Sequence, residues 1–124
     1  MAAYEEPCAF GPYLRSIRQQ RKLSLREIAR SAQITPTYLS DLERGNNHPP
    51  DKALLQKLIG ALGLQNGDEI SRTLLDLAAE GRNDLPFDIK ESVMNNRPLQ
   101  QLIRRMQMQP DPEKFCAQLL HELS

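Results

Sequence analysis

Apolar residues recur every three or four positions along most of this chain, and the alternation that marks β-strands is nearly absent. Residues 51–62 show the pattern well, because their leucines and isoleucines fall on one face of a helix. Similar stripes occupy residues 12–22, 24–32, 35–44 and 68–80, and three more occupy 86–95, 98–108 and 112–123. The pattern predicts an all-α fold.

The stretch SLREIARSAQITPTYLSDLERG, residues 24–45, contains two strong helix starts. Ser24 and Glu27 have the S-x-x-E spacing of a capping box, in which each side chain accepts a hydrogen bond from the other residue's backbone N–H. Thr35 followed by Pro36 is the second start, because threonine suits the N-cap and proline suits the first helical position. The last helix has a similar start at Asp111 and Pro112.

Glycines predict where several of these helices end. Gly45, Gly63 and Gly81 each follow the last apolar residue of a stripe, which is where a left-handed residue commonly closes a helix. The helices on either side of Gln33 and Ile34 are therefore short and joined by a tight turn. This arrangement is a helix-turn-helix unit.

The segment GRNDLP, residues 81–86, reads as a connection between two parts of the chain. We therefore expect an N-terminal tail over residues 1–9 and a five-helix domain over residues 10–81. Residues 82–124 are expected to form a C-terminal helical region for dimerisation or partner binding.

Charge is unevenly distributed between the N-terminal and C-terminal halves, although the whole chain has a formal net charge of zero. Residues 10–65 carry nine Lys/Arg against four Asp/Glu, a net charge of +5, whereas residues 66–124 carry seven against ten, a net charge of −3. This asymmetry favours a polyanionic partner for the N-terminal half only. Ordinary scatter of surface charge is the alternative.

Candidate chemistry is scarce. Cys8, Cys116, His48 and His121 do not have the spacing of a metal site, so we expect no metal and no cofactor. The sequence has no Gly-rich phosphate loop and no nucleophile elbow, and we expect no enzymatic activity. It also has neither the pattern of a signal peptide nor an apolar stretch of membrane-spanning length, which leads us to expect a cytoplasmic protein.

Residues 14–64 resemble the phage repressor/Cro family of helix-turn-helix proteins, often called the XRE family. The matching features are Arg18, SLREIA, ITPTYLSDLERG, a proline-containing loop and LLQKLIGALGL. The resemblance implies a five-helix, repressor-like DNA-binding bundle. In this family the third helix lies in the major groove and the N-terminus of the second helix abuts a phosphate.

The resemblance also implies roles for individual residues. The implied base contacts are Pro36, Thr37, Tyr38 and Asp41. Thr37 can hydrogen-bond a base edge or lay its methyl group against thymine, and Asp41 can accept from cytosine N4 or repel the wrong phosphates. Tyr38 can reach a base or a phosphate, or it can pack against the core.

The implied backbone contacts are Ser24, Leu25, Arg30, Arg44, Asn46 and Asn47. On this prediction Thr37 and Asp41 set sequence preference, whereas Arg44 and Asn47 set affinity. Many relatives have glutamine at the position of Leu25, where it helps to hold a phosphate, so this contact falls to main-chain groups and Ser24.

Two further positions are implied to be structural. Arg18 and Glu43 match a buried or half-buried ion pair between the first and third helices of the family. Gln33 stands where many members have glycine, at a turn that favours a left-handed backbone, and glutamine can adopt that conformation at some cost.

Two functions fit these observations. The first is a sequence-specific regulator that binds double-stranded DNA, and we expect a repressor acting as a homodimer on a palindromic operator. Ten large apolar residues between 86 and 123 favour dimerisation, because they exceed what one thin layer against the bundle would bury. The second is an antitoxin-like or adaptor protein whose C-terminal helices bind a protein partner.

Overall fold

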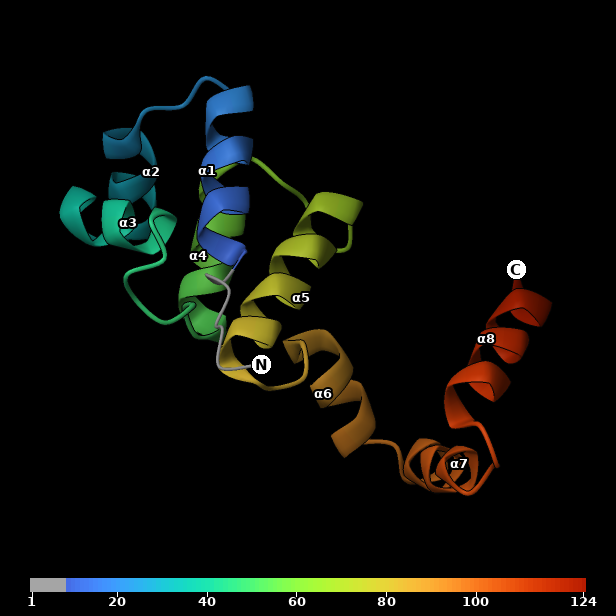
Figure 1. Ribbon diagram of the computed structural model, residues 1–124. Helices are drawn as coiled ribbons and strands as arrows, with labels where there is room; N and C mark the ends of the chain where they lie inside the picture. Colours follow the sequence, from blue (N-terminus) through green and yellow to red (C-terminus); the bar gives the residue numbers. More distant parts are fainter. Residues whose placement is uncertain (1–8) are drawn as a thin grey trace, which may run out of the picture. The chain divides into compact units, whose positions relative to one another are not determined.

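The computed structural model describes residues 9–124, and all secondary structure in that range is helical (Figure 1). The helices are α1 (Phe10–Gln20), α2 (Leu25–Ala32), α3 (Pro36–Glu43), α4 (Lys52–Ala61), α5 (Glu69–Arg82), α6 (Phe87–Met94), α7 (Arg97–Gln107) and α8 (Pro112–Leu123). The all-α prediction is therefore confirmed. Cys8 and nearly all of the expected tail, residues 1–9, lie outside the described residues.

The chain divides into two compact units, one ending at Phe87 and the other running from Asp88 to Ser124. The first contains α1 to α5. The second contains α7, α8 and all but the first residue of α6. Separate functions for the two parts of the chain remain a prediction.

Apolar side chains from α1 to α5 form one core in the first unit. Its most deeply buried members are Phe10, Leu14, Ile28, Leu39, Leu55, Leu58, Leu62 and Leu74. Burying one such side chain stabilises the fold by about 1.5–3 kcal/mol. The helix α3 contributes only Leu39, Leu42 and Glu43 to the interior, so its opposite face remains in contact with solvent.

The first turn of α1 packs very closely against the end of α3. The helix begins at Phe10, two residues earlier than the apolar pattern predicts, and its second residue is Gly11. A Cβ atom at Gly11 would clash with the carbonyl oxygen of Leu42 and lie 2.7 Å from that of Glu43. Glycine at this position therefore allows α1 to approach the backbone of α3.

Most helix ends follow the predicted signals. Gly45 and Gly63 have positive φ angles, 79° and 76°, directly after α3 and α4. The prediction for Gly81 is wrong, since α5 continues through it to Arg82 and closes at Asn83, whose φ is 55°. Asparagine tolerates this left-handed conformation. Arg82 is also anchored, because it donates to the carbonyl of Pro50 at 3.0 Å.

The second unit has no fully buried residue in the described chain. Its helices still have clear caps, because Asn96 accepts from the backbone N–H of Leu99 and Asp111 accepts from that of Lys114. Within this unit α7 packs against α8, and Cys116 Sγ lies 3.6 Å from Met106 Sδ. Large apolar side chains nonetheless remain exposed, namely Ile89, Met94, Leu102, Met108, Leu120 and Leu123.

Candidate nucleic-acid interface

The N-terminus of α2 is built by the capping box that the sequence predicts. Ser24 Oγ accepts from the backbone N–H of Glu27 at 3.0 Å, and the backbone N–H of Ser24 donates to Glu27 Oε1 at 2.8 Å. This backbone hydrogen bond is the main reason why the pKa of the Glu27 carboxyl lies below its ordinary value. Leu25 packs its side chain against the core, which leaves only its main chain available at this helix end.

The turn between α2 and α3 depends on the backbone of Gln33. Its φ and ψ angles are 62° and 41°, the left-handed conformation that glycine adopts most easily. The N–H groups of Gln33 and Ile34 donate to the carbonyls of Arg30 and Ala29, at 3.1 and 2.9 Å. These two bonds close α2 as a Schellman motif and turn the chain directly into α3.

At the start of α3, Thr35 Oγ1 accepts from the backbone N–H of Tyr38 at 3.1 Å, and Pro36 occupies the first turn. Pro36 and Thr37 are exposed, and Asp41 is half-buried. Tyr38 is 36% exposed, so its side chain is not part of the buried core. The structure thus brings the four predicted base contacts together on one short, capped helix (Figure 1).

An ion pair ties the end of α3 to α1. Arg18 Nε and Nη2 donate to the two carboxylate oxygens of Glu43 at 2.7 and 3.0 Å, and Nη1 donates to the carbonyl of Leu23 at 3.1 Å. The side chains of Arg18 and Glu43 are only 14% and 4% exposed. The hydrogen bond to Glu43 raises the pKa of Arg18, while burial opposes that increase. Such a bidentate pair fixes the orientation of the end of α3 relative to α1.

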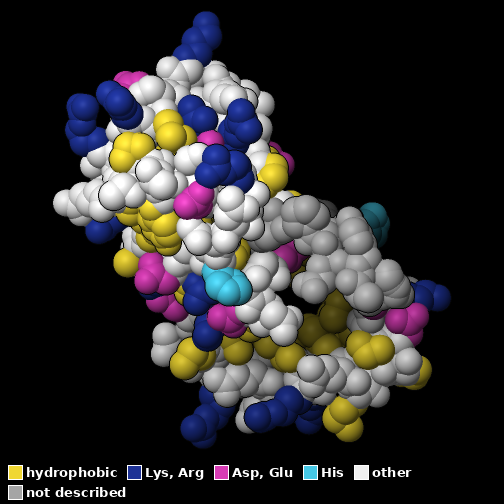
Figure 2. Space-filling view, turned by 60° about the vertical axis from the view of Figure 1, so that its left-hand side comes forward, with side chains coloured by type: hydrophobic (Ala, Val, Ile, Leu, Met, Phe, Trp, Pro, Cys, Tyr) yellow, Lys and Arg dark blue, Asp and Glu magenta, His cyan; other side chains and the backbone are white. Residues whose placement is uncertain are grey.

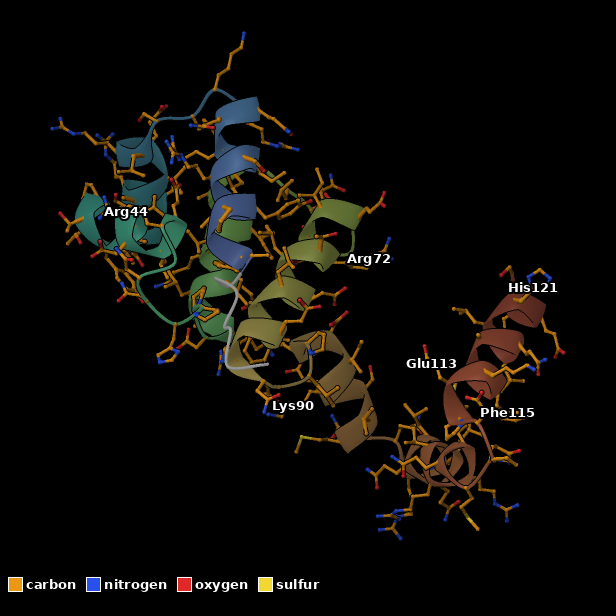
Figure 3. All side chains as sticks on the ribbon, in the orientation of Figure 1. Arg44, Arg72, Lys90, Glu113, Phe115 and His121 are labelled. Atoms are coloured by element: carbon orange, nitrogen blue, oxygen red, sulfur yellow. The ribbon has the colours of Figure 1, made fainter. Side chains whose placement is uncertain are left out.

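A second ion pair lies on the exposed side of α3. Arg44 Nη2 donates to Asp41 Oδ1 at 2.6 Å, and both side chains reach solvent. Figure 3 labels Arg44 at the end of this helix. The sequence predicts separate roles for the two residues, although their i, i+3 spacing is a signal that they can meet.

The loop after α3 leaves the predicted backbone contacts accessible. Asn46, Asn47 and His48 are exposed, and the backbone N–H of Asn46 donates to the carbonyl of Asp41 at 2.9 Å. A groove of about 550 Å³ runs beside this loop. It is lined by residues from the turn, α3, the loop and α4, including Ile34, Tyr38, His48, Asp51, Leu54 and Lys57.

Basic side chains surround this surface. Arg30 is exposed at the end of α2, and its contact with the DNA backbone stays a prediction. Arg15 on α1, Lys22 in the turn after it and Arg26 on α2 are also exposed, and none of them is among the contacts predicted from the sequence. Figure 2 shows Lys and Arg side chains gathered on the face that α2 and α3 present, with a few acidic side chains among them.

Residues 9–124 contain no cluster of three or more His, Cys, Asp or Glu residues that could hold a metal ion. None of the helices described is long and apolar enough to cross a membrane.

A match to a known protein family shows which family the chain belongs to. The family described as "Helix-turn-helix domain" matches residues 9–72, just over half of the chain. The protein belongs to this helix-turn-helix family. The match covers α1 to α4, the start of α5 and every residue of the candidate interface.

Two known proteins are similar to part of this chain. The "HTH-type transcriptional regulator DdrOP3" of Deinococcus deserti is 49% identical over 51 residues, which are 41% of this chain and 39% of that protein. The "Immunity repressor protein" of Bacillus phage phi105 is 36% identical over 55 residues, 44% of this chain and 38% of that protein. The aligned segment thus spans about two-fifths of each relative. The crystal structure of the clp gene regulator ClgR from C. glutamicum shares 35% identity, with a TM-score of 0.48, over 60% of this chain and 88% of that chain.

Proposed function

We propose that this protein is a sequence-specific regulator of transcription that binds double-stranded DNA and acts as a repressor. The observation that carries the proposal is the exposed face of α3. This short helix is capped at its start and fixed at its end by the Arg18–Glu43 pair, and it presents polar side chains to solvent within a basic surface. The helix-turn-helix family and the names of the two relatives support the same function.

The proposed complex places the start of α3 in the major groove. Thr37 contacts a base edge, while Pro36 and Tyr38 border the same base pairs. The backbone N–H groups at the start of α2 meet a phosphate, since the positive end of a helix dipole favours an anion. The remaining phosphate contacts come from Ser24, Leu25 through its main chain, Arg30, Asn46 and Asn47.

We further propose that the C-terminal unit pairs two copies of the chain. This unit exposes apolar side chains on α6 to α8, including Leu120 and Leu123, which are 69% and 84% exposed. Exposed apolar patches of this kind are typical of surfaces that bind another protein. The helices also differ in charge. The α7 sequence contains three arginines and no acid, whereas α8 contains Glu113 and Glu122 against Lys114. A two-fold pairing that sets α7 of one copy against α8 of the other would bury the leucines and match these charges.

A two-fold dimer predicts a palindromic operator. Two reading heads on one dimer would contact half-sites about one DNA turn, ~34 Å, apart. Sedimentation of the full chain and of a chain ending at Phe87, where the first compact unit ends, tests the pairing. We expect a dimeric full chain and a monomeric shortened chain. A monomeric full chain at tens of micromolar would instead favour the adaptor alternative, in which these helices bind another protein.

DNA binding is tested by selecting bound duplexes from a random pool with the full chain. We expect an enriched motif and an affinity that falls steeply with salt, with a slope of about −0.9 in log K against log salt for each phosphate neutralised. No enriched motif, together with no binding of any duplex at low salt, would refute the proposed function.

A further inference from the structure

The residues Thr37, Asp41 and Arg44 form one stripe along the exposed face of α3. Their spacing, i, i+4 and i+7, places them above one another on a helix. Arg44 caps the end of α3, where a free arginine side chain could turn toward the DNA backbone. Instead, a 2.6 Å hydrogen bond from Arg44 Nη2 to Asp41 Oδ1 keeps the Arg44 guanidinium beside Asp41, which is one helical turn nearer to Thr37.

We propose that Arg44 reads a guanine in the major groove and that Asp41 is the positioning residue that holds its guanidinium on the groove-facing stripe. The proposal rests on the proposed function. It replaces the separate roles that the sequence suggested, a base contact for Asp41 and a backbone contact for Arg44.

The chemistry of the pair supports this assignment. A guanidinium has five N–H donors in a planar fork, and the contact with Asp41 uses one nitrogen. Two N–H groups suffice for guanine N7 and O6, which is the commonest specific contact in the major groove. Asp41 also offsets the positive charge of Arg44, which weakens the attraction to a phosphate relative to a neutral base edge. The second Asp41 oxygen can still accept from a cytosine N4.

Substitutions of Asp41 and Arg44 should leave the fold intact, because the pair lies outside the core. The side chains of Arg44 and Asp41 are 57% and 33% exposed, and such exposed i, i+3 pairs contribute little to stability. Asp41→Ala and Arg44→Ala should therefore fold as the wild type does, which thermal unfolding verifies.

The test uses the duplex that the wild-type chain selects from a random pool. Dissociation constants are measured at fixed salt for wild type, Asp41→Ala, Arg44→Ala and the double variant, on that duplex and on duplexes with single base-pair changes. We expect Arg44→Ala to bind the selected duplex about 10- to 100-fold more weakly, roughly 1.4–2.8 kcal/mol at 1.4 kcal/mol per tenfold, and to lose discrimination at one G·C pair.

The Asp41→Ala variant tests whether Asp41 positions Arg44. Asp41→Ala should lose discrimination at the same G·C pair, and it should add little once Arg44 is already alanine, because a positioning residue acts through the side chain it positions. Two control variants represent the other kinds of DNA contact, one to a different base pair and one to the DNA backbone. Thr37→Ala should lose discrimination at a different base pair, and Arg30→Ala should weaken every duplex alike.

Three outcomes overturn the proposal. These are a uniform loss for Arg44→Ala like that for Arg30→Ala, preference changes for the two variants at different base pairs, or additive effects in the double variant. Each of them leaves the proposed function intact, because the wild type still selects a motif. If the wild-type chain selects no motif, the proposed function and this proposal both fail.

Discussion

Removing Glu43 should destabilise the protein far more than its position near the candidate interface suggests. Glu43→Ala leaves the Arg18 guanidinium without its two contacts at 2.7 and 3.0 Å, in a place where the Arg18 side chain is only 14% exposed. Breaking a buried pair by removing one partner costs about 3–5 kcal/mol. Because Arg18 keeps its hydrogen bond to the carbonyl of Leu23, we expect a loss near the lower end, about 3 kcal/mol.

The assay is urea unfolding of the full chain followed by circular dichroism at fixed protein concentration. The matched control is Asp41→Ala, which removes the acid of the exposed pair and should cost less than about 1 kcal/mol. Replacing both Arg18 and Glu43 by apolar residues should recover much of the loss, because no charge is then left unpaired. Equal losses for Glu43→Ala and Asp41→Ala would refute the reasoning that burial sets the cost.

Three smaller changes test the geometry of the helix-turn-helix unit and of α1 packed against it. Gly11→Ala should lower the free energy of unfolding by about 1–3 kcal/mol, because its Cβ would meet the carbonyls of Leu42 and Glu43; a neutral effect in urea unfolding would show that the helices can separate freely. Gln33→Gly should raise the melting temperature, since a non-glycine left-handed residue costs roughly 1–2 kcal/mol, and an unchanged or lower value would contradict this account. Glu27 has a lowered folded-state pKa, so its stabilising contribution is complete above the ordinary value of 4.5 and is lost as the pH falls through the folded value. Wild type should therefore lose more stability than Glu27→Gln between neutral and acidic pH, and parallel curves for the two proteins would contradict the shift.

The helices could be predicted from signals between neighbouring residues, whereas contacts between residues far apart in the sequence could not be predicted. The caps at Ser24 and Thr35 use backbone groups three residues away, so a short stretch of sequence specifies them completely. Gly11 gave no such signal, because its role depends on the backbone at Leu42 and Glu43, which are far away in the sequence. The end of α5 was misplaced for a related reason, since Arg82 gains a partner in the Pro50 carbonyl and the helix runs past its glycine.

Predicting the candidate interface from the sequence met a similar limit. The resemblance assigns roles position by position, so it treats Asp41 and Arg44 as independent residues. Their hydrogen bond depends on one rotamer of each side chain, and family patterns do not carry that information. The apolar stripes of α7 and α8 were also visible in the sequence, but only the structure shows that several of their leucines remain exposed.

The central claim is that the outer face of α3 binds duplex DNA, and residue-resolved mapping tests it most directly. Backbone amide signals of the full chain are followed by NMR while the duplex selected by the wild type is added. We expect the largest changes at Ser24 and Leu25 and from Thr37 to Asn47, and only small changes in α7 and α8. Changes concentrated in α7 and α8, with α3 unaffected, would contradict the claim.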